Sequence, residues 1–415
     1  MSSKTKIIAS RDQARPVLVP KLRFSEFLGA GDWEQKHIEN FFNVGSSKRV
    51  LQQDWTAQGI PFYRTRELVS LSKSEPFSSE IFISKSLFEE ITQKYGAPRE
   101  GDFLVSGVGT LGVSYLVKKG DEFYFKDGNV IWFSRRGGIS SSFFKYCFES
   151  DVIQDQILKQ ASVSTVGTYT IQNAKITKFY CPPTEKEQQK VSECLSSVDA
   201  LMAAQARKVD ALKTHKKGLM QQLFPREGET QPRLRFPEFQ NAGEWQIKPF
   251  AKLFSIGNGR DHKYLASGDI PVYGSGGYMR SVDDYLYDGE SVCIGRKGTI
   301  NNPMFLTGKF WTVDTLFYTH SFNQCLPKFI FSIFQGIDWL KHNEAGGVPS
   351  LSKTIIEKIE TAIPSLPEQQ RIASCLSSLD ALITAETQKL DALKTHKKGL
   401  MQQLFPSVGG VAGEA

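Results

Sequence analysis

The segment DALKTHKKGLMQQLFP occurs twice without a single change, at Asp210–Pro225 and at Asp391–Pro406. A second pair of similar segments opens each half of the chain: PKLRFSEFLGAGDW at Pro20–Trp33 and PRLRFPEFQNAGEW at Pro232–Trp245. Repetition at a fixed displacement indicates a tandem duplication. The segments between these motifs have diverged, so we expect a repeated frame that carries two different domains.

The closing blocks recur at a shorter displacement, from Asp210 to Asp391, than the opening motifs, from Pro20 to Pro232. The first variable region is therefore longer than the second. The polar link at residues 226–231 reads as an exposed connector. We expect the following order: a disordered leader (1–19), domain 1 (20–182), a first helix (183–225), domain 2 (226–363), a second helix (364–406) and a flexible tail (407–415).

Each closing repeat is predicted to be one long helix. Thr184 with Glu187, and Ser365 with Glu368, have the spacing of a capping box, and a proline follows each repeat. Apolar residues alternate by four and three positions, which is typical of a coiled-coil seam. The positions in helix 1 are Val191, Leu195, Val198, Met202, Val209, Leu212, Leu219 and Leu223, and those in helix 2 are Ile372, Leu376, Leu379, Ile383, Leu390, Leu393, Leu400 and Leu404.

Polar residues interrupt this seam at equivalent places, Gln205 and Lys216 in helix 1 and Glu386 and Lys397 in helix 2. If the helices run antiparallel, Lys216 could meet Glu386 while Gln205 meets Lys397, and such polar layers fix the register. The alternative is that these are ordinary exposed residues of a frayed seam. Leu201 and the apolar pairs 219–220 and 223–224 widen the stripe, which suits a bundle with partner helices. Two identical blocks would then bind two copies of one partner.

Both variable regions are expected to be mixed α/β domains. Short β-branched and aromatic runs alternate with Gly-rich turns; these runs are Ile60–Tyr63, Phe103–Val105, Val130–Phe133, Ser291–Ile294 and Leu316–Tyr318. Residues 101–111 and 289–300 share a faint pattern. The two domains are therefore expected to share a fold and to differ at their surfaces. The equivalent Trp33 and Trp245 are expected to be core anchors.

Bulk properties narrow the class of protein. The net charge of +7 and the pI near 8.9 favour a polyanionic partner, although solubility alone also explains them. No apolar run approaches about 18 residues, so we expect no membrane span. The six cysteines have no metal-ligand spacing and are expected to be reduced, as in a cytoplasmic protein.

Sequence motifs of catalysis are missing. We find no Asn-Pro-Pro-aromatic motif of adenine methylation, no Walker A loop, and no HExxH or catalytic-triad spacing among the six histidines. We therefore expect a chain that is not itself an enzyme and that holds no metal.

In combination, the motifs resemble the specificity subunits of type I restriction–modification systems. The segments that carry this resemblance are IPVYGSGG (Ile270–Gly277), IGRKGTI (Ile294–Ile300), GGVPSLSKTIIEKI (Gly346–Ile359) and the two helix openings, Pro182–Asp199 and Pro364–Asp380. The resemblance extends from Pro20 to Pro406. Domain 1 lacks the YGSGG and RKGTI forms, so its DNA contacts cannot be transferred from domain 2.

The resemblance implies an α+β fold in which two target recognition domains are separated by two long antiparallel helices, with internal pseudo-twofold symmetry. Each domain would read one half of a split double-stranded DNA target, and the helices would set the spacing. The implied partners are two methyltransferase subunits and, optionally, two restriction–translocase subunits. The chain itself would need no cofactor, since the methyltransferase would bind S-adenosylmethionine and the motor–nuclease would bind ATP and Mg²⁺.

DNA reading requires basic, amide or hydroxyl side chains on loops that can approach the bases and phosphates. The candidates in domain 1 are Lys48, Arg49, Arg64, Arg66, Thr110, Arg135 and Arg136. Those in domain 2 are Arg260, His262, Lys263, Tyr278, Arg296, Lys297 and Asn301. Arg296 and Lys297, which lie between two glycines, are the strongest pair. For any single residue, a solvated surface charge is the competing interpretation.

Three other functions compete with this interpretation. A coiled-coil scaffold that spaces two protein-binding domains would have no salt-dependent affinity for duplex DNA. A self-sufficient nuclease or methyltransferase is disfavoured by the missing motifs. An RNA-binding protein is disfavoured because the RNP and KH signatures are absent.

Overall fold

The computed structural model describes residues 18–73, 75, 77, 79–161 and 167–406. Nearly all of the predicted leader and all of the predicted tail lie outside these residues. The chain divides into two compact units, Met1–Ala203 with Asp391–Ala415 and Ala204–Leu390. Each unit therefore contains one α/β domain and a part of each long helix. No helix in the described part of the chain is both long and apolar enough to cross a membrane.

The main sheet of domain 1 has the order β2-β9-β6-β7, with antiparallel neighbours throughout. These strands are β2 (Phe42–Gly45), β9 (Val130–Arg135), β6 (Phe103–Ser106) and β7 (Ser114–Leu116). All four residues of β6 are buried, because side chains alternate between two covered faces. Phe103 packs with Phe144 of α3 (Ser141–Glu149), and Leu104 packs on the other face with Leu68 of α1 (Thr65–Ser72).

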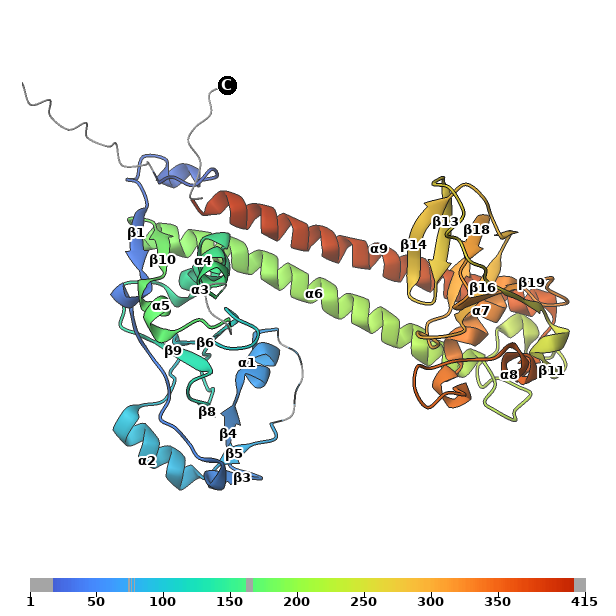
Figure 1. The fold of residues 1–415 in the computed structure, drawn as a ribbon, viewed down its shortest axis with the longest axis horizontal. Helices are drawn as coiled ribbons and strands as arrows, with labels where there is room; N and C mark the ends of the chain where they lie inside the picture. Colours follow the sequence, from blue (N-terminus) through green and yellow to red (C-terminus); the bar gives the residue numbers. More distant parts are fainter. Residues whose placement is uncertain (1–17, 74, 76, 78, 162–166, 407–415) are drawn as a thin grey trace, which may run out of the picture. The chain divides into compact units, whose positions relative to one another are not determined.

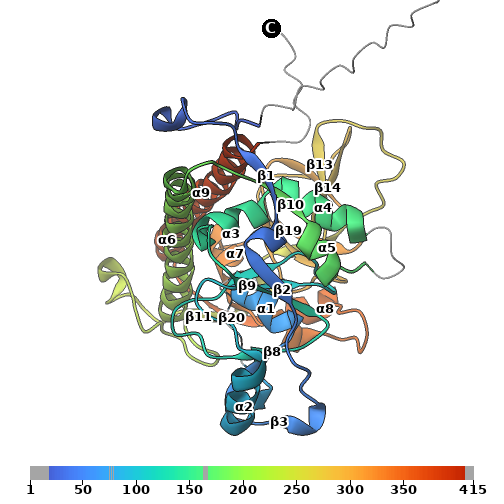
Figure 2. The same cartoon turned by 90° about the vertical axis from the view of Figure 1, so that its left-hand side faces the viewer.

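A second sheet of domain 1 has the order β3-β5-β4-β8, in which β4 and β8 run parallel. Its strands are β3 (Trp55–Thr56), β5 (Phe82–Ile83), β4 (Ile60–Tyr63) and β8 (Tyr124–Phe125). The remaining elements are α2 (Lys85–Tyr95), α4 (Asp151–Ala161), α5 (Ile171–Ile176) and the strand pair β1 (Glu34–His37) and β10 (Lys178–Cys181). Figures 1 and 2 both show α2 and β3 at the end of the domain remote from β1 and β10.

Domain 2 repeats this topology in its main sheet and in the parallel pair of its second sheet, whereas β3 and β15 have no counterparts. Its sheets have the orders β12-β19-β16-β17 and β14-β13-β18-β15, and β13 and β18 are the parallel pair. The strands are β12 (Ser255–Asn258), β19 (Leu316–His320), β16 (Ser291–Gly295), β17 (Met304–Leu306), β14 (Gly277–Val282), β13 (Ile270–Gly274), β18 (Lys309–Thr312) and β15 (Tyr287–Asp288). A further pair, β11 (Gln246–Pro249) with β20 (Glu360–Ile363), matches β1 with β10. The helices are α7 (Pro327–Gly336) and α8 (Lys353–Lys358). The prediction of a shared fold is confirmed.

Short 3₁₀ turns complete both domains. Those of domain 1 are Ser25–Phe27, Ile38–Asn40 and Gln52–Asp54, and those of domain 2 are Pro237–Phe239, Phe250–Lys252 and Trp339–His342. The domains differ most in the segment that joins the first strand of the parallel pair, β4 or β13, to strand β6 or β16 of the main sheet. Domain 1 has α1 and α2 within residues 64–102, whereas domain 2 has the β13–β14 hairpin and β15 by residue 290. Much of the extra length of domain 1 therefore forms helices.

The closing repeats form the helices α6 (Glu185–Leu223) and α9 (Leu366–Leu404), each of 39 residues, close to the bounds predicted for them. In the second unit, Lys216 of α6 binds Asp380 of α9, and Gln205 binds Glu386. The residue numbers rise along one helix while they fall along the other, so the helices pair antiparallel.

The predicted pairing of Lys216 with Glu386 and of Gln205 with Lys397 is wrong. Lys216 Nζ lies 2.6 Å from Asp380 Oδ1, and Gln205 Nε2 lies 2.7 Å from Glu386 Oε2. Lys397 instead binds Asp199 at 2.8 Å and Glu149 at 3.1 Å. The reason is that the antiparallel register places the equivalent positions 205 and 386 opposite each other. The lysines then reach aspartates beside the seam.

The opening motifs are fastened to the start of each helix by a buried acid. The Glu187 carboxylate accepts hydrogen bonds from the Arg23 guanidinium at 2.7 Å and from Trp33 Nε1 at 3.0 Å. In the second copy, Glu368 accepts them in the same way from Arg235 and Trp245. Both tryptophans are buried, so their predicted role as core anchors is confirmed.

The ends of the repeated helices pack within the protein itself. Leu223 and Leu404 are each 1% exposed, and both belong to the core of the domain in their unit. Phe405 packs edge-on against Trp33, and Phe224 does so against Trp245. We expected these terminal apolar residues to pack against helices of a partner. This expectation is wrong for Leu223, which is buried in the core of its own domain. Leu201, in contrast, is exposed.

Candidate nucleic-acid interface

In domain 2, the loops that carry most of the candidate residues meet at one edge of the two sheets. The backbone N–H of Arg260 donates to the Thr312 carbonyl, and that of Arg296 donates to the Thr315 carbonyl, both at 2.8 Å. The N–H of Val313 donates to the Tyr273 carbonyl. We call this surface, formed by residues 259–264, 275–279, 296–302 and 313–315, the domain-2 edge.

Two glycines allow these loops to pack closely. A Cβ atom on Gly259 would lie 1.9 Å from the Val313 carbonyl oxygen, so no other residue fits there. Gly298 has a φ of +89°, which side chains disfavour, and its Cβ position lies 3.3 Å from Ser275 Oγ. The Arg296-Lys297 loop therefore lies directly beside the turn of the β13–β14 hairpin.

The domain-2 edge presents cations without acidic partners. Within the described residues, no carboxylate lies at ion-pair distance from Arg296, Lys297, Arg260 or Lys263, all of which are exposed. The Arg296 guanidinium lies 5.9 Å from the centre of the Phe317 ring, a cation–π distance. His262 lies between Arg260 and Lys263 in the sequence, and its Nδ1 is 3.9 Å from Asp261 Oδ1. Asn301 is exposed on the loop of Arg296, and Tyr278 is exposed at the start of β14.

Domain 1 has an equivalent edge. The N–H of Gly107 donates to the Asn129 carbonyl, and that of Lys126 donates to the Tyr63 carbonyl, both at 2.8 Å. The N–H of Lys48 donates to Tyr124 Oη at 2.9 Å. These bonds bring together five candidates on neighbouring segments: Lys48, Arg49, Arg64, Arg66 and Thr110. We call the segments 46–49, 64–67 (the start of α1), 107–112 and 126–129 the domain-1 edge.

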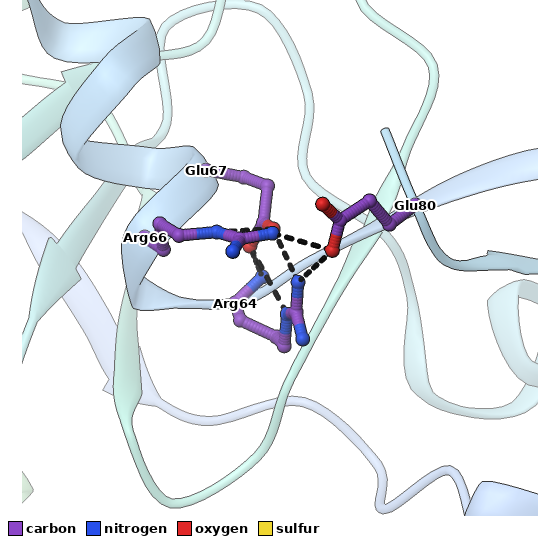
Figure 3. A network of polar contacts seen from close by, with 4 residues as sticks. All are labelled: Arg64, Arg66, Glu67 and Glu80. Carbon is purple, nitrogen blue, oxygen red and sulfur yellow. Dashed lines mark hydrogen bonds and ion pairs between the residues drawn. The ribbon is translucent and has the colours of Figure 1, made fainter. Parts of the chain in front are cut away.

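The arginines of the domain-1 edge are already paired with acids. Arg49 Nε lies 2.8 Å from Asp127. Figure 3 shows Arg64 and Arg66 converging on Glu67 and Glu80, with the Arg64–Glu67 and Arg66–Glu80 contacts both at 2.6 Å. Burial raises the pKa of Glu67, but hydrogen bonds from Arg64 outweigh it and the net shift is downward. The hydrogen bond from Arg66 likewise lowers the pKa of Glu80.

Arg135 and Arg136 do not join the other candidates. Strand β9 begins at Val130, opposite Ser106 near the domain-1 edge, and ends at Arg135, beyond Phe103. The Arg135 guanidinium donates to the Ile139 carbonyl at 3.1 Å. The two arginines thus lie toward the opposite end of the sheet from Thr110.

Two exposed apolar residues belong to the domain-2 edge: Tyr264, on the loop of the candidate Lys263, and Met279, which was not predicted. Tyr264 packs edge-on against the buried Trp311. Met279 was missed because strand alternation does not reveal a β-bulge. The described residues contain no cluster of three or more His, Cys, Asp and Glu side chains that could hold a metal ion.

A family model, the type I restriction modification DNA specificity domain, matches this chain twice, at residues 30–214 and 242–395. These two matches cover most of the chain. The chain belongs to the family of type I restriction modification DNA specificity domains. It contains two copies of that domain, as the duplication had predicted.

Three curated relatives are similar to the chain. A protein of Haemophilus influenzae described as a putative type I restriction enzyme specificity subunit is 30% identical over 38% of the chain. The MjaVIII specificity subunit of Methanocaldococcus jannaschii is 32% identical over 29% of the chain. The matches span 38% and 27% of these two relatives' own lengths. The MjaX specificity subunit of the latter organism is 21% identical, over 90% of this chain and 93% of its own.

Two solved structures of the family share the fold. The S subunit of a type I restriction–modification system from M. genitalium aligns with a TM-score of 0.60 at 15% identity, over 94% of this chain and all of its own. A chain from a study of the assembly and conformational transition of a type I system aligns with a TM-score of 0.53 at 14% identity, over 90% of this chain and 98% of that one.

Proposed function

We propose that this chain is the DNA-reading subunit of a type I restriction–modification complex, in which each domain reads one half of a bipartite target. The observation that carries the proposal is the duplicated topology combined with two chemically different loop edges. Domain 2 offers unpaired cations on glycine-bordered loops, and domain 1 offers arginines held by Glu67 and Glu80. Two readers with the same fold and different surfaces are suited to two different half-sites.

Charge supports DNA as the ligand. Exposed arginine and lysine side chains bind phosphates and the edges of guanine, and the chain has a net charge of +7. Methylation, translocation and cleavage would be carried out by the partners. S-adenosylmethionine would be bound by the methyltransferase, and ATP and Mg²⁺ by the motor–nuclease, so that this chain contributes recognition and no catalysis.

The long helices would set the spacing between the half-sites and bind two methyltransferase subunits. The exposed leucines at equivalent positions, Leu201 on α6 and Leu382 on α9, support two equivalent docking sites. They are 58% and 41% exposed. The terminal residue Leu223 serves the chain's own core instead.

Mapping methylated bases genome-wide, after co-expression with the neighbouring methyltransferase subunit, tests this proposal. A split motif with two short defined parts around a fixed gap is expected. Exchange of residues 20–182 for the same domain of another family member should change one part only. A continuous motif would contradict the two-reader proposal. A stable complex without methylation or salt-dependent duplex binding would favour the coiled-coil scaffold.

A further inference from the structure

The β13–β14 hairpin carries exposed apolar side chains at the domain-2 edge. Tyr278 and Met279 are neighbours in sequence, yet they are 62% and 53% exposed. Tyr264 on the adjacent loop is 71% exposed. Exposed apolar groups that are neighbours on a protein surface, such as Tyr278 and Met279, are typical of a binding surface.

A β-bulge creates this surface. Val272 pairs with Arg280 and Tyr273 pairs with Tyr278, so Met279 is an extra residue in β14. Successive residues of a regular strand point to opposite faces, and a bulge redirects the side chains beside it. This accounts for the exposure of two consecutive side chains.

Neighbouring groups hold the two side chains in place. Met279 Sδ lies 3.0 Å from the position that a Cβ on Gly274 would occupy, so the thioether lies across this glycine. The Tyr278 ring packs edge-on against Tyr273, with the ring centres 6.2 Å apart. Tyr278 Oη is 3.2 Å from Ser281 Oγ. These contacts restrict both side chains before any partner binds.

Cations lie close to the apolar tip of the hairpin. The hairpin turn at Ser275 adjoins Gly298, which follows Arg296 and Lys297. Arg280, the neighbour of Met279, donates to the Leu265 carbonyl, which belongs to the segment that holds Lys263. A complementary partner must combine negative charge with an apolar group.

The major groove of B-form DNA has this arrangement. Phosphates line its rims, it admits a two-stranded β-ribbon, and the C5-methyl of thymine is the apolar group on its floor. The major groove of double-stranded RNA is too narrow for such an entry, and uracil lacks the methyl group. Charge complementarity and the apolar tip together thus favour duplex DNA.

We propose that the β13–β14 hairpin enters the major groove and that Met279 and Tyr278 contact thymine C5-methyl groups in the half-site read by domain 2. The half-site of domain 2 then contains at least one A·T pair that is specified through its methyl group. This inference rests on the proposed DNA-reading function and specifies one of its contacts.

The test replaces each thymine of the domain-2 half-site by deoxyuridine, which removes only the methyl group. The full chain, assembled with the methyltransferase subunit, is titrated with both duplexes at one salt concentration. The dissociation constant should rise about fourfold for each methyl group lost, the value expected for one buried carbon. The Met279→Ala complex should bind the normal duplex more weakly and should respond less to deoxyuridine than the wild type does.

Ile247→Ala is the matched control, because Ile247 is an exposed apolar residue on β11, outside the domain-2 edge. This variant should retain the full deoxyuridine effect. The inference is overturned if the half-site contains no thymine. It is also overturned if the folded Met279→Ala variant keeps the wild-type affinity and the wild-type response to deoxyuridine. Absence of any salt-dependent duplex binding by the wild type would overturn the proposed function as well, and is a separate result.

Discussion

At the scale of single residues, the two candidate edges differ in whether their cations must break an existing ion pair in order to bind DNA. Arg296 has no ionic partner among the described residues, whereas Arg66 contacts both Glu67 and Glu80. An unpaired cation can move onto a phosphate or a base without breaking an existing ion pair. We therefore expect the domain-2 edge to supply more of the electrostatic affinity than the domain-1 edge.

Arg296→Ala should weaken binding of the cognate duplex by about 1–3 kcal/mol if the guanidinium reads a base edge. The substitution removes an exposed side chain, so the fold should be unaffected. Binding is measured at fixed salt with the assembled complex. Lys252→Ala is the matched control, since Lys252 is exposed and precedes β12, at the end opposite Arg260. Equal affinity of wild type and Arg296→Ala would show that Arg296 makes no contact with DNA.

At the scale of elements, a buried ion pair joins each opening motif to its helix. The side chains of Arg23 and Glu187 are 4% and 1% exposed. The hydrogen bond to Glu187 raises the pKa of Arg23, so the guanidinium stays charged across the physiological range. The same arrangement recurs with Arg235 and Glu368, whose side chains are 9% and 1% exposed. The strong similarity of the two opening motifs thus has a structural cause.

Arg23→Ala should lower the free energy of unfolding of the first unit by about 3–5 kcal/mol, because it leaves the Glu187 carboxylate buried and without its cation. The measurement is urea unfolding, followed by the fluorescence of Trp33 in variants that lack the other five tryptophans of the chain. Lys21→Ala, at an exposed position in the same motif, should have no such effect. A loss below about 1 kcal/mol for Arg23→Ala would match a surface ion pair and contradict the prediction.

Glu386 makes the helix pairing of the second unit sensitive to acid. Hydrogen bonds from Gln205, and then from Lys389 and Lys208, lower its pKa to about 2. A folded-state pKa below the ordinary value of about 4.3 means that the ionised carboxylate favours the folded state. Its contribution is fully present above this ordinary value and is lost as the pH falls toward 2.

Glu386→Gln should therefore flatten the pH dependence of stability between about pH 4.5 and 2. Unfolding free energies of wild type and variant are compared at several pH values, and the difference between them isolates Glu386 from the other acids. Glu193→Gln, on an exposed face of α6, provides the reference. If the two variants have the same pH profile, the Gln205–Glu386 contact does not contribute to folding.

The elements themselves could be predicted from sequence, because their signals are local. The seam and the terminal prolines located α6 and α9, and short apolar runs located β4, β6, β9, β16 and β19. The helix register could not be predicted, because it depends on side groups such as Gln335 and Glu149, which periodicity does not connect to the seam.

For the candidate sites, the sequence predicted which segments carry them but not which acidic residues pair with their arginines. Glu80 lies 14 residues from Arg66, so no local pattern indicated that it would neutralise this arginine. The role of Glu187 was misread in part: its N–H does bind Thr184 Oγ1, but its carboxylate binds Arg23 and Trp33. The recurrence of Arg, Trp and Glu in both copies was the signal that could have revealed this pair.

At the scale of the whole molecule, each compact unit combines one α/β domain with parts of both helices. The contacts of one unit recur in the other: Lys216 with Asp380 in the second, and Lys397 with Asp199 in the first. Each unit can therefore hold its own helix segments in register with its own domain. Changes confined to one edge should leave the contacts of the other unit intact.

Combining Arg66→Ala at the domain-1 edge with Arg296→Ala at the domain-2 edge should give additive losses of binding free energy. The two residues belong to different units and share no partner among the described residues, and independent sites usually add to within about 0.5 kcal/mol. Each single variant should relax only one half of the methylated motif, and the double variant should relax both halves without changing the gap. A clear departure from additivity, or relaxation of both halves by a single variant, would mean that the two readers are coupled, because independent domains cannot transmit a change made at one edge to the other half-site.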